Sequence, residues 1–186
     1  MLGWILLALV GLILVWLVLI YNGLVSIRND MQNAWKQIDV QLKRRHDLIP
    51  NLVQTIRGMM EFEQDTLEKV VTARTNAVAA ATPSSKAAAE NMLTQTIGKL
   101  FAVMENYPAL KSNQNVIQLQ EELTSTEDKL AFARQLYNDL VANYRTKIQI
   151  FPNNFVSSMF NFQSAEYFGA DEADRAVPSV NLSLRK

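Results

Sequence analysis

The architecture of this chain rests on its first apolar stretch, MLGWILLALVGLILVWLVLIY (residues 1–21). It contains no charged side chain and no proline, and the first charge of the chain is Arg28. As a helix it would extend roughly 30 Å, the thickness of the hydrocarbon core of a bilayer. A signal peptide would need a basic segment before the apolar run and small residues at a cleavage site, where bulky Trp16 and Tyr21 stand instead. We therefore predict an uncleaved transmembrane anchor over residues 1–22, rather than a signal peptide or the buried helix of a soluble core.

Positive charge lies on the C-terminal side of this stretch. The basic residues that follow it are Arg28, Lys36, Lys43, Arg44 and Arg45, whereas only the terminal amine lies before it. Acidic residues nearby count for little in the positive-inside rule. We predict a single-pass membrane protein with its N-terminus outside and its C-terminal domain in the cytoplasm.

The composition indicates one helical domain without a nucleic-acid function. Eighteen basic and eighteen acidic side chains give zero formal net charge, whereas proteins that bind nucleic acids usually carry a basic surplus on one face. The absence of cysteine excludes disulfides, thiolate metal sites and a cysteine nucleophile. Glycine and proline number only six and five, which is typical of a helical chain. The part after the anchor is long enough for one domain with its own core.

Beyond the anchor, apolar residues recur at heptad spacing, which predicts helices. Two rows keep their phase across Pro50: Leu24, Met31, Ile38, Arg45, Leu52 and Met59 in one, and Trp35, Leu42, Ile49, Ile56, Glu63, Val70 and Ala77 in the other. A proline inside a helix removes one backbone donor and bends the helix. We predict one long helix over about 23–81, bent near Pro50. The alternative is a new helix with Asp47 as its N-cap and Pro50 in its first turn.

Two further helices are predicted after a chain reversal. Thr82 can cap a helix over about 83–106, with Pro83 at the first position, where a missing amide costs nothing. A second helix, over about 113–150, carries the most regular apolar seam of the chain and ends before Pro152.

The predicted fold class is therefore all-α. A single N-terminal transmembrane helix continues into an elongated antiparallel, up-and-down helical bundle over residues 23–151. Residues 152–168 are predicted to form a short aromatic-rich helical segment, and residues 169–186 an extended tail. Because the heptad phase begins directly after the anchor, we expect no flexible linker between the anchor and the bundle.

Three charged residues fall on apolar rows and are predicted to be structural buried charges: Arg45, Glu63 and Arg74. A buried charge needs a partner, and such pairs can define the register of helices. Candidate partners of Arg45 are Glu127, Asp128 and Glu121. The single histidine, His46, is expected to be a partly exposed helix residue, because no second ligand pattern or nucleophile accompanies it.

The aromatic-rich segment contributes a predicted interaction surface, formed by Phe155, Met159, Phe160, Phe162, Tyr167 and Phe168. One interpretation is that these side chains cover an open end or groove of the bundle. The other is that they dock another copy of the chain, a partner or the membrane interface.

The sequence contains no Gly-rich phosphate loop, no catalytic triad and no metal-ligand spacing. We therefore predict that the protein is not an enzyme, has no catalytic, cofactor-binding or metal-binding residues, and uses no cofactor.

Several segments resemble the signatures of the LemA family. They are AWKQIDVQLKRRHDLIPNLV (residues 34–53), ENYPALKSNQN (105–115), LQEELTSTEDKLAFARQLYN (119–138) and FPNNFVSSMFNF (151–162). The C-terminal pattern YF…R…PSVNL is also similar to the family's ending. The resemblance implies a bacterial inner-membrane protein with one N-terminal span and a cytoplasmic helical bundle. It implies no particular activity.

Taken together, these features favour a non-enzymatic, membrane-anchored helical scaffold that self-associates, docks a membrane partner, or does both. The alternative hypothesis is a membrane-remodelling or membrane-organising module that forms oligomeric arrays on the bilayer. The expected partners are membrane lipid through the N-terminal helix and further copies of the chain, with a membrane protein as a further candidate and no nucleic acid.

Overall fold

The computed structural model describes residues 1–169, and this part of the chain contains helices and no strand. The helices are α1 (Leu2–Arg57), α2 (Gln64–Ala79), α3 (Pro83–Met104), α4 (Pro108–Lys111), α5 (Gln114–Gln149) and α6 (Asn153–Met159), with a 3-10 turn, η1 (Glu61–Glu63), before α2. The predicted all-α class is confirmed. The predicted extended tail lies outside the described residues, apart from Gly169.

Helix α1 runs without interruption from the apolar stretch into the bundle, through Gly23 and Pro50. The alternative of a new helix capped by Asp47 is therefore wrong. Pro50 has no amide hydrogen to donate to the carbonyl of His46, one turn earlier. The Nε–H of Arg74, on α2, donates to that carbonyl oxygen at 2.9 Å in its place. A neighbouring helix thus supplies the hydrogen bond that the proline removes, and α1 continues.

The predicted continuation of this helix to about residue 81 is wrong, because the chain reverses at residues 58–63. After α1 ends, the amides of Met59 and Met60 both donate to the carbonyl of Ile56, at 2.9 and 3.1 Å. Met60 leaves helical torsions and buries its side chain completely in the core. The heptad rows keep their phase across the reversal because α1 and α2 both face this core. Phase alone therefore does not show whether two helical segments are continuous or antiparallel.

Helices α3 and α5 begin at side-chain caps that satisfy their first amides. Thr82 and Ser85 form a capping box before α3, in which each side-chain oxygen accepts from the other residue's amide, at 3.1 and 3.0 Å. Asn113 caps α5, since its Oδ1 accepts from the amides of Asn115 and Val116. Exposed amides at a helix start would otherwise lack a partner, so these short polar residues define where α3 and α5 begin.

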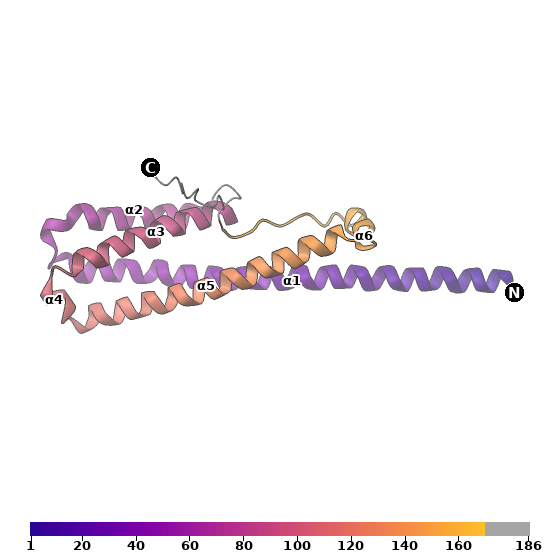
Figure 1. Cartoon of the computed structure of the whole chain (residues 1–186), viewed down its shortest axis with the longest axis horizontal. Coiled ribbons are helices and arrows are strands. Elements are labelled where there is room, and N and C mark those ends of the chain that lie inside the picture. The colour runs from indigo at the N-terminus through magenta and orange to yellow at the C-terminus, as the bar shows by residue number, and fades with distance from the viewer. Residues whose placement is uncertain (170–186) are drawn as a thin grey trace, which may run out of the picture.

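The helices form an elongated up-and-down bundle (Figure 1). Helices α1 and α5 pack against each other along most of the bundle, while α2 and α3 form a hairpin that covers the end remote from the N-terminus. Helix α6 packs on α5 and on the middle part of α1, and the N-terminal part of α1 projects alone. The core is therefore long and narrow, and one of its ends lies where the projecting part of α1 begins.

The chain leaves α6 through a left-handed turn at Asn161, whose φ is 54°. The amide of Phe162 donates to the carbonyl of Ser157 at 2.8 Å, and that of Asn161 donates to Ser158 at 3.3 Å. This pairing is a Schellman motif, which commonly ends a helix and favours Gly or Asn at the left-handed position. It reverses the chain so that Phe162 turns back into the core.

Candidate functional site

The N-terminal part of α1 is a bare helix of bilayer length. Every residue from Leu2 to Trp16 is exposed, and the first side chains that pack on the bundle are those of Leu17, Ile20 and Tyr21. At about 1.5 Å per residue, the segment before Tyr21 extends roughly 28 Å, close to the thickness of a hydrocarbon core. This is the one helix within residues 1–169 that is long and apolar enough to cross a membrane. Its mean hydropathy reaches 2.9 over 18 residues, none of them buried.

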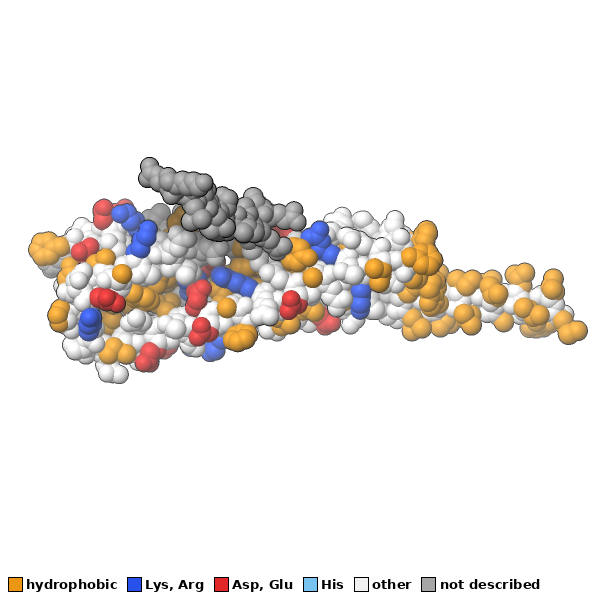
Figure 2. Space-filling model, in the orientation of Figure 1, with side chains coloured by type: hydrophobic (Ala, Val, Ile, Leu, Met, Phe, Trp, Pro, Cys, Tyr) orange, Lys and Arg blue, Asp and Glu red, His pale blue; other side chains and the backbone are white. Residues whose placement is uncertain are grey.

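Helix α6 closes the end of the bundle beside this bare helix. Val156 and Phe162 are buried against Leu24 of α1, and the ring of Tyr21 lies 4.8 Å from that of Phe160. The outward-facing side chains form what we call the apolar foot: Ile150, Phe151, Phe155, Met159 and Phe160, which are 46–76% exposed. Figure 2 shows hydrophobic side chains as a band at the step where the wide bundle gives way to the single helix.

Three cations stand directly behind the foot. Arg28, Arg145 and Lys147, here named the cationic collar, are the only charged residues within residues 1–29 and 140–165. The guanidinium of Arg28 lies 5.1 Å from the centre of the Phe162 ring, and that of Arg145 lies 5.1 Å from the Tyr167 ring. These contacts hold Arg28 and Arg145 beside the aromatic segment. In Figure 2 the charged side chains nearest to the apolar band are basic.

The chain after α6 is held along α5 by side-chain hydrogen bonds to its backbone. The hydroxyl of Tyr144 donates to the carbonyl of Gln163 at 2.9 Å, and that of Tyr137 donates to Glu166 at 2.8 Å. Asn138 both donates to and accepts from the backbone of Phe168, each at 2.8 Å. Burial raises the pKa of both phenols, so they remain neutral donors. These side-chain bonds therefore hold residues 162–168, which we call the strap, against α5 without backbone pairing to a strand.

The predicted aromatic surface is consequently divided between core and exterior. Phe162 and Phe168 are buried and Tyr167 is half-buried, while Phe155, Met159 and Phe160 are exposed. Phe168 packs against Trp35 and Tyr137 instead of joining the foot. The second half of the segment therefore covers a groove of the bundle, whereas the docking role of its exposed first half stays a prediction.

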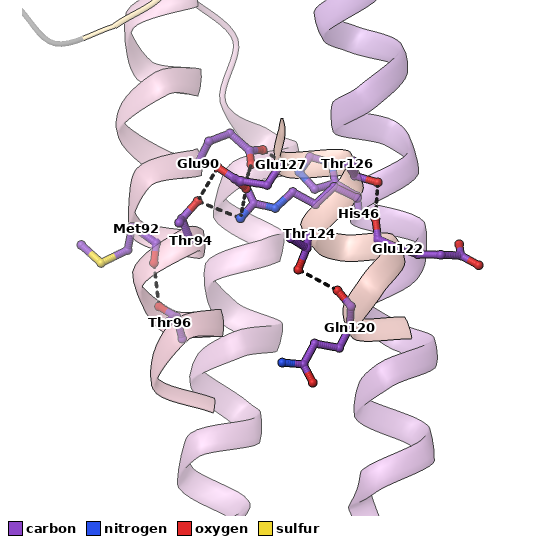
Figure 3. A network of polar contacts seen from close by, with 11 residues as sticks. His46, Glu90, Met92, Thr94, Thr96, Gln120, Glu122, Thr124, Thr126 and Glu127 are labelled. Atoms are coloured by element: carbon purple, nitrogen blue, oxygen red, sulfur yellow. Dashed lines mark hydrogen bonds and ion pairs between the residues drawn. The ribbon is translucent and has the colours of Figure 1, made fainter. Parts of the chain in front are cut away.

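A second cluster lies inside the bundle, where α1, α3 and α5 meet (Figure 3). Arg45, 3% exposed, reaches the carboxylate of Glu90 at 3.0 Å and that of Glu127 at 2.8 Å. It also donates to the hydroxyl of Thr94 at 2.7 Å. The other oxygen of Glu90 lies 2.6 Å from Nε2 of His46. Charges removed from water are stable only with such close partners, so this network selects one register for the three helices.

The burial of the charged residues and of His46 differs in part from the sequence predictions. Arg45 is buried as predicted and pairs with Glu127, one of its three candidate partners. Glu63 and Arg74 are partly exposed instead of buried. Each lies at an edge of the bundle, where Glu63 accepts from the hydroxyl of Tyr107 at 3.4 Å. His46 is buried at 9% exposure, which contradicts the expected partly exposed position.

Glu90, which is completely buried, is the central residue that the sequence reasoning missed. A signal for it exists, because the buried residues Ala87, Leu93, Ile97 and Leu100 of α3 share its three- and four-residue spacing. A glutamate on such a seam indicates a buried carboxylate. Within residues 1–169, no group of three histidine or acidic side chains is arranged to hold a metal ion. The contacts of Arg45 with Glu90 and Glu127 are ion pairs that join α1 to α3 and α5.

A third surface follows the joint between α1 and α5. Its shallow groove of about 470 Å³ is lined by Lys36, Gln37, Val40, Gln41, Lys129, Phe132, Ala133 and Leu136. Val40, Phe132 and Leu136 are exposed at 62%, 74% and 44%. We refer to this surface as the α1/α5 face.

Comparisons with known proteins agree with the resemblance in the sequence. The family model described as LemA family matches residues 34–182. Protein LemA from Metamycoplasma hominis is 26% identical over 155 residues, covering 83% of this chain and 71% of that protein. Magnetosome protein MamQ 2 from Paramagnetospirillum magneticum is 25% identical over 174 residues, covering 80% of this chain. Magnetosome protein MamQ from Magnetospirillum gryphiswaldense is 24% identical over the same length. The chain spans 64% of the length of each of these two magnetosome proteins.

Proposed function

The chain belongs to the LemA family, and from this premise we propose that it is a non-enzymatic, membrane-anchored helical scaffold whose bundle stands at a set angle to the bilayer. Membrane association is supported by the bare apolar helix and by relatives named as magnetosome proteins. The scaffold presents its outer faces to further copies of the chain or to a membrane protein. Its membrane is the bacterial inner membrane, with the N-terminus outside and the bundle in the cytoplasm.

One observation carries this proposal: the anchor and the longest helix of the bundle are the same helix, α1. A flexible linker would let the bundle swing freely. Here α1 crosses Gly23 without a break, and the network around Arg45 and the bond from Arg74 lock its later turns to α2, α3 and α5. A continuous helix transmits its tilt in the membrane to the whole bundle.

The orientation is supported by the basic residues that follow the apolar stretch, since Lys and Arg are retained on the cytoplasmic side. Because the chain lacks cysteine, a single introduced thiol reports its own location. Phe62, 94% exposed at the remote end of the bundle, is a suitable site for Phe62→Cys. We expect a membrane-impermeant maleimide to label this thiol only after the cells are permeabilised. Labelling in intact cells would overturn the cytoplasmic location.

The set angle is tested by the height of the same thiol above the membrane. A donor dye on Phe62→Cys in proteoliposomes, with acceptor lipids at the surface, should report a narrow distribution near the length of α1 beyond Tyr21, roughly 55 Å. A six-residue Gly-Ser insertion between Asn22 and Gly23 should broaden the distribution and shift it toward the membrane. The same insertion after Asn106, in the loop before α4, is the matched control and should leave the distance distribution unchanged. Equally broad distributions in the parent chain and in both insertion variants would refute a rigid connection.

A second candidate function is a membrane-organising or membrane-remodelling module that assembles into arrays. It is favoured by the α1/α5 face, where the exposed ring of Phe132 forms part of the wall of a shallow groove together with Val40 and Leu136. Anchored copies share one orientation, so each Phe132 meets this groove on a neighbour at the same height above the membrane. We expect Phe132→Cys to crosslink between copies in membranes, whereas Val78→Cys, exposed on α2, should not. Equal crosslinking at both sites would argue against a specific array.

A further inference from the structure

We propose that the membrane-proximal end of the bundle is a second lipid-binding surface, distinct from the anchor. The apolar foot enters the boundary between headgroups and acyl chains, and the cationic collar binds the phosphates of anionic phospholipids. This inference deepens the proposed function and rests on it in one respect, namely that α1 spans the bilayer.

The foot lies where the bare part of α1 reaches the bundle. Leu17, Ile20 and Tyr21 pack there against the core cluster that contains Ile148 and Val156, and the bare helix has covered roughly 28 Å from its start. If this length spans the hydrocarbon core, the foot lies in the plane of the adjoining interface. Tyr21 and Phe160 are in contact there, and aromatic rings prefer this layer of a membrane.

The side chains of the foot are highly exposed. The foot gathers five large apolar side chains on one short segment, and Phe151, Phe155 and Met159 are each more than two-thirds exposed. Soluble surfaces rarely present such a patch unless it has a binding partner. The patch is continuous with the anchor, whose partner is lipid. Lipid therefore covers both surfaces without a further component.

The charges that flank the foot in the sequence are all basic. The described chain around the foot carries three cations and no acid, and acidic residues return only at Asp30, Asp139 and Glu166. Arg28 lies seven residues beyond Tyr21, about 10 Å along the helix, so its side chain reaches the headgroup layer. A partner for this arrangement must be apolar beside the foot and anionic beside the collar. An anionic lipid surface has these two layers in that order.

The test uses the full chain in vesicles, with an environment-sensitive fluorophore on Met159→Cys and quenching lipids that carry a nitroxide at a known depth. The same label on Phe62→Cys is the matched control, and a label on Leu9→Cys reports whether α1 spans. We expect strong quenching of the Met159 label by shallow nitroxides, of the Leu9 label by deep nitroxides, and none at Phe62. Quenching at Leu9 without quenching at Met159 overturns this inference alone. No quenching at Leu9 overturns the proposed function as well.

Charge is tested by the enrichment of phosphatidylglycerol over phosphatidylcholine around the full chain in mixed vesicles. A Lys or Arg near an anionic surface strengthens the association about fivefold. The triple variant Arg28→Gln, Arg145→Gln, Lys147→Gln should therefore lose most of the enrichment. Replacing Lys69, Lys99 and Lys111, at the remote end, should leave the enrichment unchanged. Equal enrichment in both triple variants would overturn the proposal. So would a label at residue 159 that is shielded from water by a second copy of the chain and not by lipid.

Discussion

Replacing Arg45 by methionine should destabilise the bundle strongly, although methionine fits an apolar seam. Arg45 is 3% exposed and its two carboxylate partners lie within 3.0 Å. Its removal leaves Glu90, which is completely buried, with His46 as its remaining hydrogen-bond partner. The cost comes from the carboxylate that stays behind, because an unpaired charge is poorly solvated inside a protein.

The expected loss is about 3 kcal/mol, near the lower end of values for a broken buried pair, since His46 still supports Glu90. Glu90→Leu should cost a similar amount, because Arg45 then keeps only Glu127 as an acidic partner, and Glu127 lies at the edge of the core. When both are replaced, no buried charge is left alone. The double variant should therefore be more stable than the sum of the single effects implies, by at least about 1 kcal/mol.

The matched control is the neighbouring residue, Arg44→Met. Arg44 is half-exposed and its guanidinium lies 3.6 Å from the carboxylate of Glu122, so its loss should cost less than about 1 kcal/mol. Thermal unfolding of the full chain in detergent, followed by circular dichroism, measures all four variants. A loss of 3 kcal/mol corresponds to a decrease in Tm of roughly 6–12 °C.

Two outcomes would refute this reasoning. If Arg45→Met and Arg44→Met lower the Tm equally, the buried network contributes no more than a surface pair. If the costs of Arg45→Met and Glu90→Leu add without coupling, the two side chains do not act through each other, and the register of α1 and α3 must be held by apolar packing alone.

Two further predictions concern hydrogen bonds to the backbone. Arg74→Met should lower the free energy of unfolding by about 1–2 kcal/mol, because it leaves the carbonyl of His46 without a donor. Adding Pro50→Ala should recover most of this loss by restoring the main-chain bond. Urea unfolding of the two variants measures both effects, and no recovery would contradict the bond between Arg74 and this carbonyl. The strap should detach at alkaline pH, because burial raises the pKa of Tyr144 above that of the unfolded phenol. Its stabilising effect is complete below about pH 10 and is lost as the pH rises through the folded-state pKa. The exchange rate of the amides near Gln163, relative to the intrinsic rate at the same pH, should rise there. Tyr144→Phe should show this high relative rate at every pH, and a relative rate unchanged from the parent chain in this variant would count against the strap bond.

The sequence was most informative where a feature depends on near neighbours. The apolar length of residues 1–21 and the three- and four-residue spacing predicted helices, and Thr82 followed by Pro83 marked the start of α3. The error over residues 58–63 has a definite cause. A turn that preserves heptad phase and contains no left-handed residue resembles a continuing helix, since Gly58 itself keeps helical torsions.

Side-chain partners were less predictable, because they join residues far apart in the chain. Arg45 was recognisable as a charge on an apolar row, but its contact with Glu90 spans 45 positions and depends on how α3 lies against α1. Likewise, no local pattern links Arg74 to Pro50, although Arg74 donates to the one carbonyl to which Pro50 cannot donate. Such pairs become visible only when the helices are placed.

By itself, the sequence determined the length of the bare apolar helix, the helical class and the distribution of charge, because these depend on composition and local periodicity. Only the tertiary structure decided where the chain turns back, which charges are buried together and where α6 comes to rest. The last point matters most for function. The foot lies beside Tyr21 because the antiparallel α5 returns the chain along α1 to the place where the bare helix begins, and that return depends on packing between distant segments.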